Sequence, residues 1–141
     1  MEGLRNVSKY NARKASVNGI VFDSKLEGDY YLMLKEKLEN GEIRTFERQP
    51  VFLLQDKFKK NGKTFRKIEY KADFKIIHND GSIEIVDVKG FETPEFRLKR
   101  KLFEKRYPYT LTIVKYVKKY GGWITMDEYK KRKRDEKRGP R

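Results

Sequence analysis

The sequence predicts a single α/β domain in which helices flank a mixed β-sheet. Three observations carry this prediction. Segments with helical apolar spacing alternate with strand-like segments, turn signals separate neighbouring strands, and one helical segment stands between the last two strands. With 141 residues, of which 37% are hydrophobic and 13% aromatic, the chain is long enough for one buried core.

The first elements are a basic arm, a short strand and a helix. Residues 1–18 are polar and basic, which indicates an extended arm, and residues 19–22 form a short strand candidate. A helix over residues 23–41 follows, because Ser24 and Glu27 have capping-box spacing and an Asn-Gly pair ends the segment. Its expected apolar stripe consists of Leu26, Tyr30, Met33, Leu34 and Leu38.

Strands fill the middle of the chain. They are expected at residues 43–48, 50–55, 64–77 and 82–89, with turns at 61–62 and 79–81. Thr93, Pro94 and Glu95 then have the order of an N-cap, a first helical residue and an acidic first turn, which predicts a helix to about residue 106. A strand over 109–117, joined by this helical crossover, and a basic helix capped by Thr125 complete the fold.

The chain is strongly basic. It has 35 Lys and Arg against 21 Asp and Glu, a net charge of +14, whose commonest meaning is a polyanionic partner such as nucleic acid. Residues 130–141 contain eight basic and two acidic residues, so they form either a solvated, disordered end or a flexible arm on phosphates. The expected boundaries are a basic arm over 1–18, one domain over 19–129 and a basic tail over 130–141.

Composition excludes several kinds of site. The absence of cysteine excludes disulfides, thiolate nucleophiles and Cys-based zinc sites, and a single His excludes sites built from several histidines. No apolar run approaches the ~20 residues of a membrane span, and the start of the chain lacks an apolar signal segment. We therefore expect no membrane partner and an intracellular, cytoplasmic protein.

One hairpin carries the residues of the candidate site. A three-residue loop closed by Gly81 in the left-handed conformation would place Asp73 opposite Asp87 on one face of the sheet. Lys89, two residues further along, shares that face. A two-residue loop would instead pair Asp73 with Val88 and create no shared site.

Two carboxylates that face each other across paired strands, one of them in an otherwise apolar strand, need a counter-charge. Like charges directly opposed are destabilising, and a buried unpaired carboxylate is costly. A divalent cation resolves both problems, because Mg²⁺ takes carboxylate oxygens and waters. Lys89 beside it could then orient an attacking water or stabilise charge on a phosphate. The alternative is a surface ion pair between Asp87 and Lys89 on an edge strand, which carries no chemistry.

Four segments, FDSKLEGDYYL, ERQPVFLLQ, YKADFKI and IVDVKGF, carry a family resemblance. With Asp73 followed by Asp87-Val88-Lys89, and a preceding helix that contains Glu27, they resemble the PD-(D/E)XK nuclease superfamily. They are most similar to small phage and prophage endonucleases, often grouped with phage endonuclease I and archaeal-type Holliday-junction resolvases. The resemblance covers roughly residues 9–116 and implies a restriction-endonuclease-like fold.

The resemblance implies roles residue by residue. Ala72 stands where the superfamily's name has proline. Glu27 also has a purely structural explanation in the capping box, and Gln49 has one as an ordinary polar strand residue. The implied cofactor is Mg²⁺ or Mn²⁺. The implied catalytic residues are Glu27, Asp73, Asp87 and Lys89, the implied metal ligands are Glu27, Asp73, Asp87 and the carbonyl of Val88, and the implied auxiliary residue is Gln49.

The implied activity is a metal-dependent DNA endonuclease whose products carry 5′-phosphate and 3′-hydroxyl ends. The implied substrate is branched DNA, specifically the four-way junction, and symmetric cleavage implies a homodimer. The alternatives are a nuclease for flaps or ordinary duplex and a non-catalytic DNA- or RNA-binding module. The expected DNA-binding residues are Arg13 and Lys14 of the arm and Arg97, Arg100 and Lys101 of the helix that begins at Pro94. For the three helix residues, a solvated basic face is the alternative.

Overall fold

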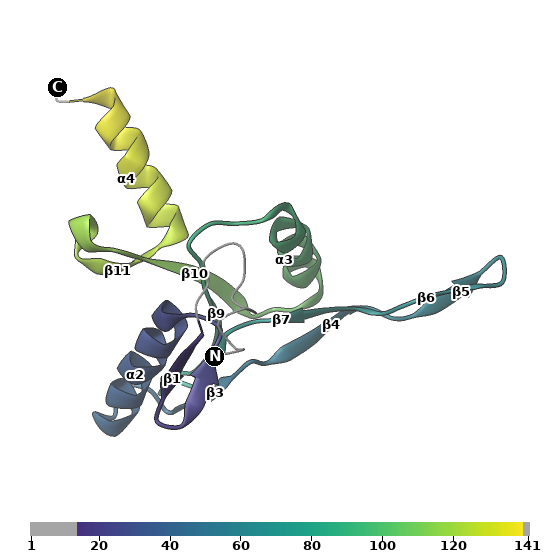
Figure 1. Cartoon of the computed structure of the whole chain (residues 1–141), viewed down its shortest axis with the longest axis horizontal. Helices are drawn as coiled ribbons and strands as arrows, with labels where there is room; N and C mark the ends of the chain where they lie inside the picture. The colour runs from purple at the N-terminus through teal and green to yellow at the C-terminus, as the bar shows by residue number, and fades with distance from the viewer. Residues whose placement is uncertain (1–13, 140–141) are drawn as a thin grey trace, which may run out of the picture. The chain divides into compact units, whose positions relative to one another are not determined.

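The computed structural model describes residues 14–139 and confirms a mixed α/β fold (Figure 1). The chain separates into two compact units, an N-terminal unit that ends at Glu42 and a C-terminal unit that begins at Ile43. Within the described range, no helix is long and apolar enough to cross a membrane. The candidate acidic pair and Lys89 all belong to the C-terminal unit.

In the N-terminal unit a short hairpin precedes one helix. Strands β1 (Ala15–Val17) and β2 (Ile20–Phe22) pair antiparallel, and helix α2 (Lys25–Glu39) follows them. The helix begins as the sequence predicts, because the Ser24 side chain accepts a hydrogen bond from the amide of Glu27 (3.1 Å). The last part of the expected arm is therefore paired in a hairpin.

A five-stranded mixed sheet forms the centre of the C-terminal unit. In spatial order its strands are β11 (Gly122–Thr125), β10 (Thr110–Val117), β9 (Ile83–Val88), β8 (Phe74–Ile77) and β3 (Thr45–Arg48). Strands β8 and β9 pair antiparallel through a hairpin. Strands β9 and β10 are parallel, because helix α3 (Pro94–Arg106) forms the crossover between them. The predicted hairpin and the predicted helical crossover are thus both confirmed.

The main core of this unit lies between α3 and one face of the sheet. Phe96 and Phe103 lie on the buried side of α3 and pack with Ile85 of β9 and Ile113 of β10. Complete burial of such side chains contributes about 1.5–3 kcal/mol each. The packing fixes the first turn of α3 against the sheet, beside the end of β9.

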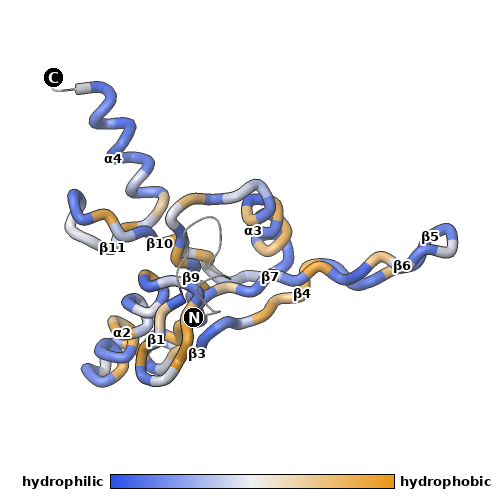
Figure 2. The backbone as a smooth tube through the Cα atoms, in the orientation of Figure 1, coloured by the Kyte–Doolittle hydropathy of each residue, from blue (hydrophilic) through white to orange (hydrophobic). Residues whose placement is uncertain are grey.

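A long two-stranded ribbon extends away from this sheet (Figure 1). Strands β4 (Val51–Gln55) and β7 (Ile68–Lys71) form its inner part, and β5 (Phe58–Lys60) and β6 (Lys63–Phe65) form its outer part. The outer end is mostly hydrophilic, as Figure 2 shows.

The prediction of one continuous strand over 64–77 is wrong. The segment consists of β6, β7 and β8, because the chain changes its pairing partner from β4 to β3 at Ala72–Asp73. Alternating polarity continues through this break, so the sequence pattern alone did not reveal it. The break lies at one of the two predicted acidic residues.

The C-terminal segment is helical where a flexible tail was predicted. After a 3₁₀ turn, η1 (Lys118–Tyr120), and strand β11, helix α4 (Met126–Arg138) includes most of residues 130–141. Thr125 caps this helix as expected, and Arg132 pairs with Glu128 one turn earlier (3.1 Å). Strand β11 is not among the predicted strands, because two adjacent glycines precede its apolar residues.

Candidate metal and catalytic site

The β8–β9 hairpin has the three-residue loop that the sequence predicts. The amide of His78 donates to the carbonyl oxygen of Ser82 (2.9 Å), and Gly81 has a φ of 88°, which few side-chain-bearing residues adopt. Every paired position between the two strands follows this register. The register therefore brings Asp73, just before β8, opposite Asp87 of β9.

The carboxyl groups of Asp73 and Asp87 interact directly. Asp87 is only 1% exposed. One oxygen of Asp73 accepts a hydrogen bond from the amide of Val88 (2.7 Å), and one oxygen of Asp87 accepts a hydrogen bond from the hydroxyl of Tyr70. These bonds hold two acidic groups at one place in fixed orientations.

Burial is the largest cause of a raised pKa at Asp87. The charge of Asp73 raises the pKa of Asp87 further, whereas Lys89 and the Tyr70 hydroxyl lower it, and the resulting pKa is about 8. Burial and the neighbouring Asp87 also raise the pKa of Tyr70, so its hydroxyl remains a hydrogen-bond donor. Without a cation, the acidic pair therefore tends to retain a proton at neutral pH.

Lys89 lies beside the acidic pair. Its Nζ atom is 3.8 Å from Oδ1 of Asp87 and 4.6 Å from the centre of the Phe96 ring. Strand β9 has a neighbour on each side, β8 and β10, and the Asp87 side chain is 2% exposed. The alternative of a surface ion pair on an edge strand is therefore wrong. The predicted trio of Asp73, Asp87 and Lys89 shares one buried to half-buried site.

Gln49 lies at the bend where the strands change partners. Its amide donates to the carbonyl oxygen of Asp73 (2.9 Å), and its φ of 51° is unusual for a residue other than glycine. Such a backbone conformation costs on the order of 1 kcal/mol, and strained residues of this kind cluster at functional sites as well as in turns. The backbone amide of Gln49 thus supports Asp73, a contact that the sequence did not indicate.

A cleft of about 370 Å³ opens beside Lys89. Its lining comes from the inner ribbon, the end of β9 and the first turns of α3, and it includes Tyr70, Lys71, Lys89 and Lys99. Lys99 also pairs with Glu95 at the helix start (3.3 Å). Glu69 and Glu95 also line the cleft, but the three ammonium groups outnumber these two carboxylates, which suits an anionic group such as a phosphate.

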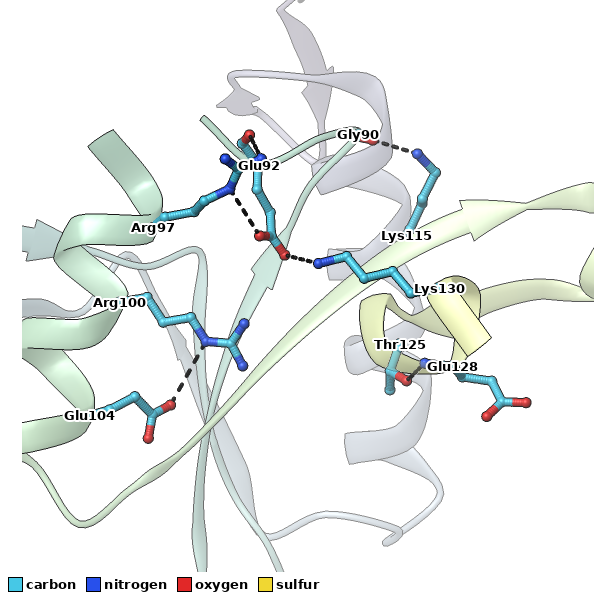
Figure 3. Close-up of polar contacts among 9 residues, drawn as sticks. All are labelled: Gly90, Glu92, Arg97, Arg100, Glu104, Lys115, Thr125, Glu128 and Lys130. Carbon is cyan, nitrogen blue, oxygen red and sulfur yellow. Dashed lines mark hydrogen bonds and ion pairs between the residues drawn. The ribbon is translucent and has the colours of Figure 1, made fainter. Parts of the chain in front are cut away.

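Side chains from α3, α4 and β10 contact the loop after Lys89, as Figure 3 shows. The Glu92 side chain is 8% exposed and pairs with Arg97 of α3 (3.7 Å) and with Lys130 of α4 (3.5 Å). Lys115 of β10 donates to the carbonyl oxygen of Gly90. Because this loop joins β9 to α3, these contacts hold the strand end that carries Lys89.

The predicted residues Arg13, Lys14 and Glu27 precede the C-terminal unit in the sequence. Glu27 belongs to the N-terminal unit, in which it is 4% exposed, so its role beside the acidic pair stays a prediction. Lys14 is exposed and directly precedes β1, and Arg13 lies outside the described residues.

The basic residues predicted on α3 do not line the cleft as the structure describes it. Arg97 is engaged with Glu92, Arg100 lies 4.0 Å from Glu104, and Lys101 is exposed. Lys99 lines the cleft instead, because it follows the buried Phe96 by one helical turn. This position was available from helical periodicity and was missed.

Tyr70 and Lys71 were also missed as site residues. Tyr70 donates to Asp87 only because the chain bends between β7 and β8, and no local pattern indicates that bend. Lys71 precedes the same bend, and its position in the lining of the cleft depends on it.

Two carboxyl groups suffice for one kind of metal site. Among residues 14–139, no group of three or more His, Cys, Asp or Glu side chains is arranged to hold a metal ion. Mg²⁺ binds through one or two carboxylates and keeps several waters, and it relieves the repulsion that raises the pKa of Asp87. Oxygen donors without histidine or sulfur favour Mg²⁺ or Mn²⁺ over zinc or copper. The donor set therefore fits the expected cofactor.

Comparison with known proteins identifies a family that the chain matches. A protein-family model described as "Protein of unknown function (DUF1064)" matches residues 7–122, which include every residue of the acidic site and of the cleft. No curated protein and no solved structure matches the chain.

Proposed function

The chain belongs to the DUF1064 family, and we propose that it is a metal-dependent DNA endonuclease that hydrolyses phosphodiester bonds. One observation carries the proposal. Two interacting carboxyl groups, Asp73 and Asp87, lie next to an ammonium group, Lys89, beside a cleft lined by lysines. Metal-dependent phosphodiester hydrolysis requires a held cation, a positioned water and neutralisation of phosphate charge.

Each residue of the site has a distinct role in this proposal. When bound, Mg²⁺ or Mn²⁺ supplies a Lewis acid and lowers the pKa of water. Asp73 and Asp87 hold the cation, with the Val88 carbonyl as a further ligand. The Tyr70 hydroxyl and the Val88 amide keep the carboxylate oxygens oriented. Lys89 orients the attacking water.

The substrate is proposed from charge and from the family resemblance. The net charge of +14 favours a polyanion, and the lysines of the cleft favour a phosphate at the site itself. The resemblance to Holliday-junction resolvases supports branched DNA as substrate, a homodimer, and Glu27 as a further metal ligand. Flaps and ordinary duplex remain the alternative substrates within the same chemistry.

A cleavage assay tests the proposal. A labelled four-way junction, a flap and a duplex are each incubated with the full chain in Mg²⁺, in Mn²⁺ and in EDTA. We expect metal-dependent cutting, fastest on the junction, and a loss of at least about 100-fold in the single-turnover rate for Asp87→Asn.

A matched control separates chemistry from charge. Asp80 lies in the turn of the same hairpin and is exposed, so Asp80→Asn should cut at close to the wild-type rate. A chain that binds these DNAs but leaves all of them intact in both metals would instead be a non-catalytic binding module.

A further inference from the structure

The outer ribbon is the most uniformly basic exposed segment of the described chain. Residues 57–67 contain six Lys or Arg and no acidic residue, and every residue from 55 to 67 is exposed. On α3 and α4, by contrast, acidic partners accompany many basic residues, as in the pairs Lys99–Glu95 and Arg132–Glu128.

Most charges of the ribbon have no counter-charge. Within residues 14–139, Lys67 is the one ribbon cation with an acidic partner, Glu69 at 3.5 Å. Lys60 and Lys63 are directly opposite each other next to the turn, an arrangement of like charges that destabilises a hairpin. An anion between or beside them would remove this repulsion, so the ribbon is poised for a polyanion.

A cross-strand aromatic pair stiffens the ribbon behind these lysines. Phe58 and Phe65 are paired, and their rings stack with centres 4.8 Å apart and planes 10° apart. Because side chains alternate between the two faces, Lys60 and Lys63 share the face of this pair, whereas Lys59 points to the other face. The ribbon is therefore basic on both faces.

This shape favours duplex DNA over other nucleic acids. The major groove of B-form DNA is about 12 Å wide and admits a two-stranded β-ribbon, whose two faces then meet the two phosphate walls. The major groove of duplex RNA is too narrow and deep for such an insertion. Single strands bind by stacking bases on aromatic rings, and Phe58 and Phe65, 43% and 42% exposed, each have one ring face covered by the other, so fewer ring faces remain for stacking.

We propose that the β5–β6 ribbon inserts into the major groove of duplex DNA, where Lys59, Lys60 and Lys63 contact phosphates. The inference deepens the proposed function and rests on it for the choice of DNA. The ribbon continues from the strands that line the cleft, and the eight steps along the chain from Lys63 to Lys71 span up to roughly 26 Å at about 3.3 Å per residue. The ribbon thus contacts a duplex about eight base pairs from the cleft.

Binding without cleavage tests the ribbon independently of the chemistry. Fluorescence anisotropy of a labelled DNA duplex of 20 base pairs is measured with the full chain in EDTA, from 50 to 300 mM NaCl. The triple variant Lys59→Gln, Lys60→Gln, Lys63→Gln should bind at least tenfold more weakly at 100 mM NaCl. Its slope of log affinity against log salt should be shallower by about 2–3, since each lost phosphate contact removes about 0.9.

A charge-matched control is available on α2. The triple variant Lys25→Gln, Lys35→Gln, Lys37→Gln lowers the net charge by the same amount and should change affinity less than threefold. Equal losses in the two triple variants would overturn the proposal, because net charge alone would then explain binding. So would wild-type affinity for single-stranded DNA or duplex RNA equal to that for duplex DNA, or a change of oligomeric state in the ribbon variant alone.

Failure of this inference and failure of the proposed function are distinguishable. A chain that binds duplex through the ribbon but never cuts would refute the nuclease and leave the ribbon proposal supported. A chain that cuts in Mg²⁺ but binds equally well without the ribbon lysines would refute the ribbon proposal alone.

Discussion

The β8–β9 hairpin and the β5–β6 ribbon each end in a tight turn that contains a positive-φ glycine, Gly81 in the first and Gly62 in the second. Their surroundings differ. The first hairpin has strands on both sides, and its Asp87 is 1% exposed. The outer ribbon has no neighbouring strand in the described chain, and all of its side chains are exposed.

This difference separates two uses of charge. A buried carboxyl group has a strongly shifted pKa and fixed partners, so it suits chemistry that depends on position. Exposed lysines keep their hydration and contribute affinity through release of counterions, which tolerates imprecise geometry. Substitutions in the hairpin should therefore change rates, and substitutions in the ribbon should change binding.

Replacement of Lys89 by alanine gives the largest expected effect. The ammonium group lies 3.8 Å from Asp87, where it can orient the attacking water. We expect the single-turnover cleavage rate to fall at least about 100-fold, as for loss of a proton-handling or orienting group, while DNA affinity changes less than about threefold.

Lys75→Ala is the matched control for Lys89→Ala. Lys75 lies on β8 and pairs with Glu47 (3.6 Å), and it does not line the cleft as described. A cleavage rate near that of the wild type is expected. If Lys89→Ala weakened binding as much as cutting, Lys89 would belong with the ribbon lysines as a binding residue.

Asp87→Asn should stabilise the metal-free protein at high pH. The pKa of Asp87 is about 8 in the folded chain and about 4 when unfolded, so the folded state binds more protons between these values. Stability of the wild type therefore falls as pH rises from about 4 to 8, and asparagine abolishes this loss. In EDTA at pH 8 we expect a melting temperature about 5 °C or more above wild type, and a smaller gain at pH 5.

Asp80→Asn should show the opposite sign. Hydrogen bonds from the Ser82 hydroxyl and amide lower the pKa of the exposed Asp80 carboxyl, which therefore stabilises the folded chain at neutral pH and loses this contribution under acid. A small decrease in melting temperature at pH 7 is expected.

Added Mg²⁺ should raise the melting temperature of the wild type more than that of Asp87→Asn, and the absence of any Mg²⁺-dependent shift would count against the metal site.

The two turn glycines test the comparison directly. Valine at a positive φ costs about 1–2 kcal/mol in either turn. Gly81→Val should lower the global melting temperature by roughly 5 °C, because its hairpin is central to the sheet. Gly62→Val strains only the ribbon, which has little buried surface and opens locally, so the global melting temperature should stay within about 1 °C. Equal decreases, measured by calorimetry, would show that the ribbon folds as one unit with the core.

Register and helix caps were predictable because they depend on local chemistry. The His78–Ser82 pairing follows from three turn residues, and α3 begins after Thr93 as its N-cap spacing indicates. From this register the sequence also placed Asp73 opposite Asp87 and put Lys89 on the same face.

The bend at Gln49 and Asp73 was not predictable in the same way. It arises from a change of pairing partner between strands distant in sequence, and alternating polarity is the same on both sides of it. The roles of Tyr70 and Lys71 depend on that bend. The helix capped by Thr125 was predicted, but its continuation from residue 130 to Arg138 was missed, because the composition there, basic and almost free of apolar residues, is also that of a solvated tail.

Glu92→Gln should have the smallest effect and sharpen the comparison between buried and exposed charge. The Glu92 carboxylate is 8% exposed, but Arg97 and Lys130, its partners, are 63% and 53% exposed and can turn to water. We therefore expect a loss of about 1 kcal/mol rather than the 3–5 kcal/mol typical of a broken buried pair. Because the loop also holds the end of β9, the cleavage rate should fall less than about tenfold with DNA affinity unchanged.

A Lys130→Gln variant, measured by the same melting and cleavage assays, should lose less stability than Glu92→Gln, since Arg97 continues to neutralise Glu92. A larger rate loss than for Lys89→Ala would instead assign Glu92 to the chemistry itself.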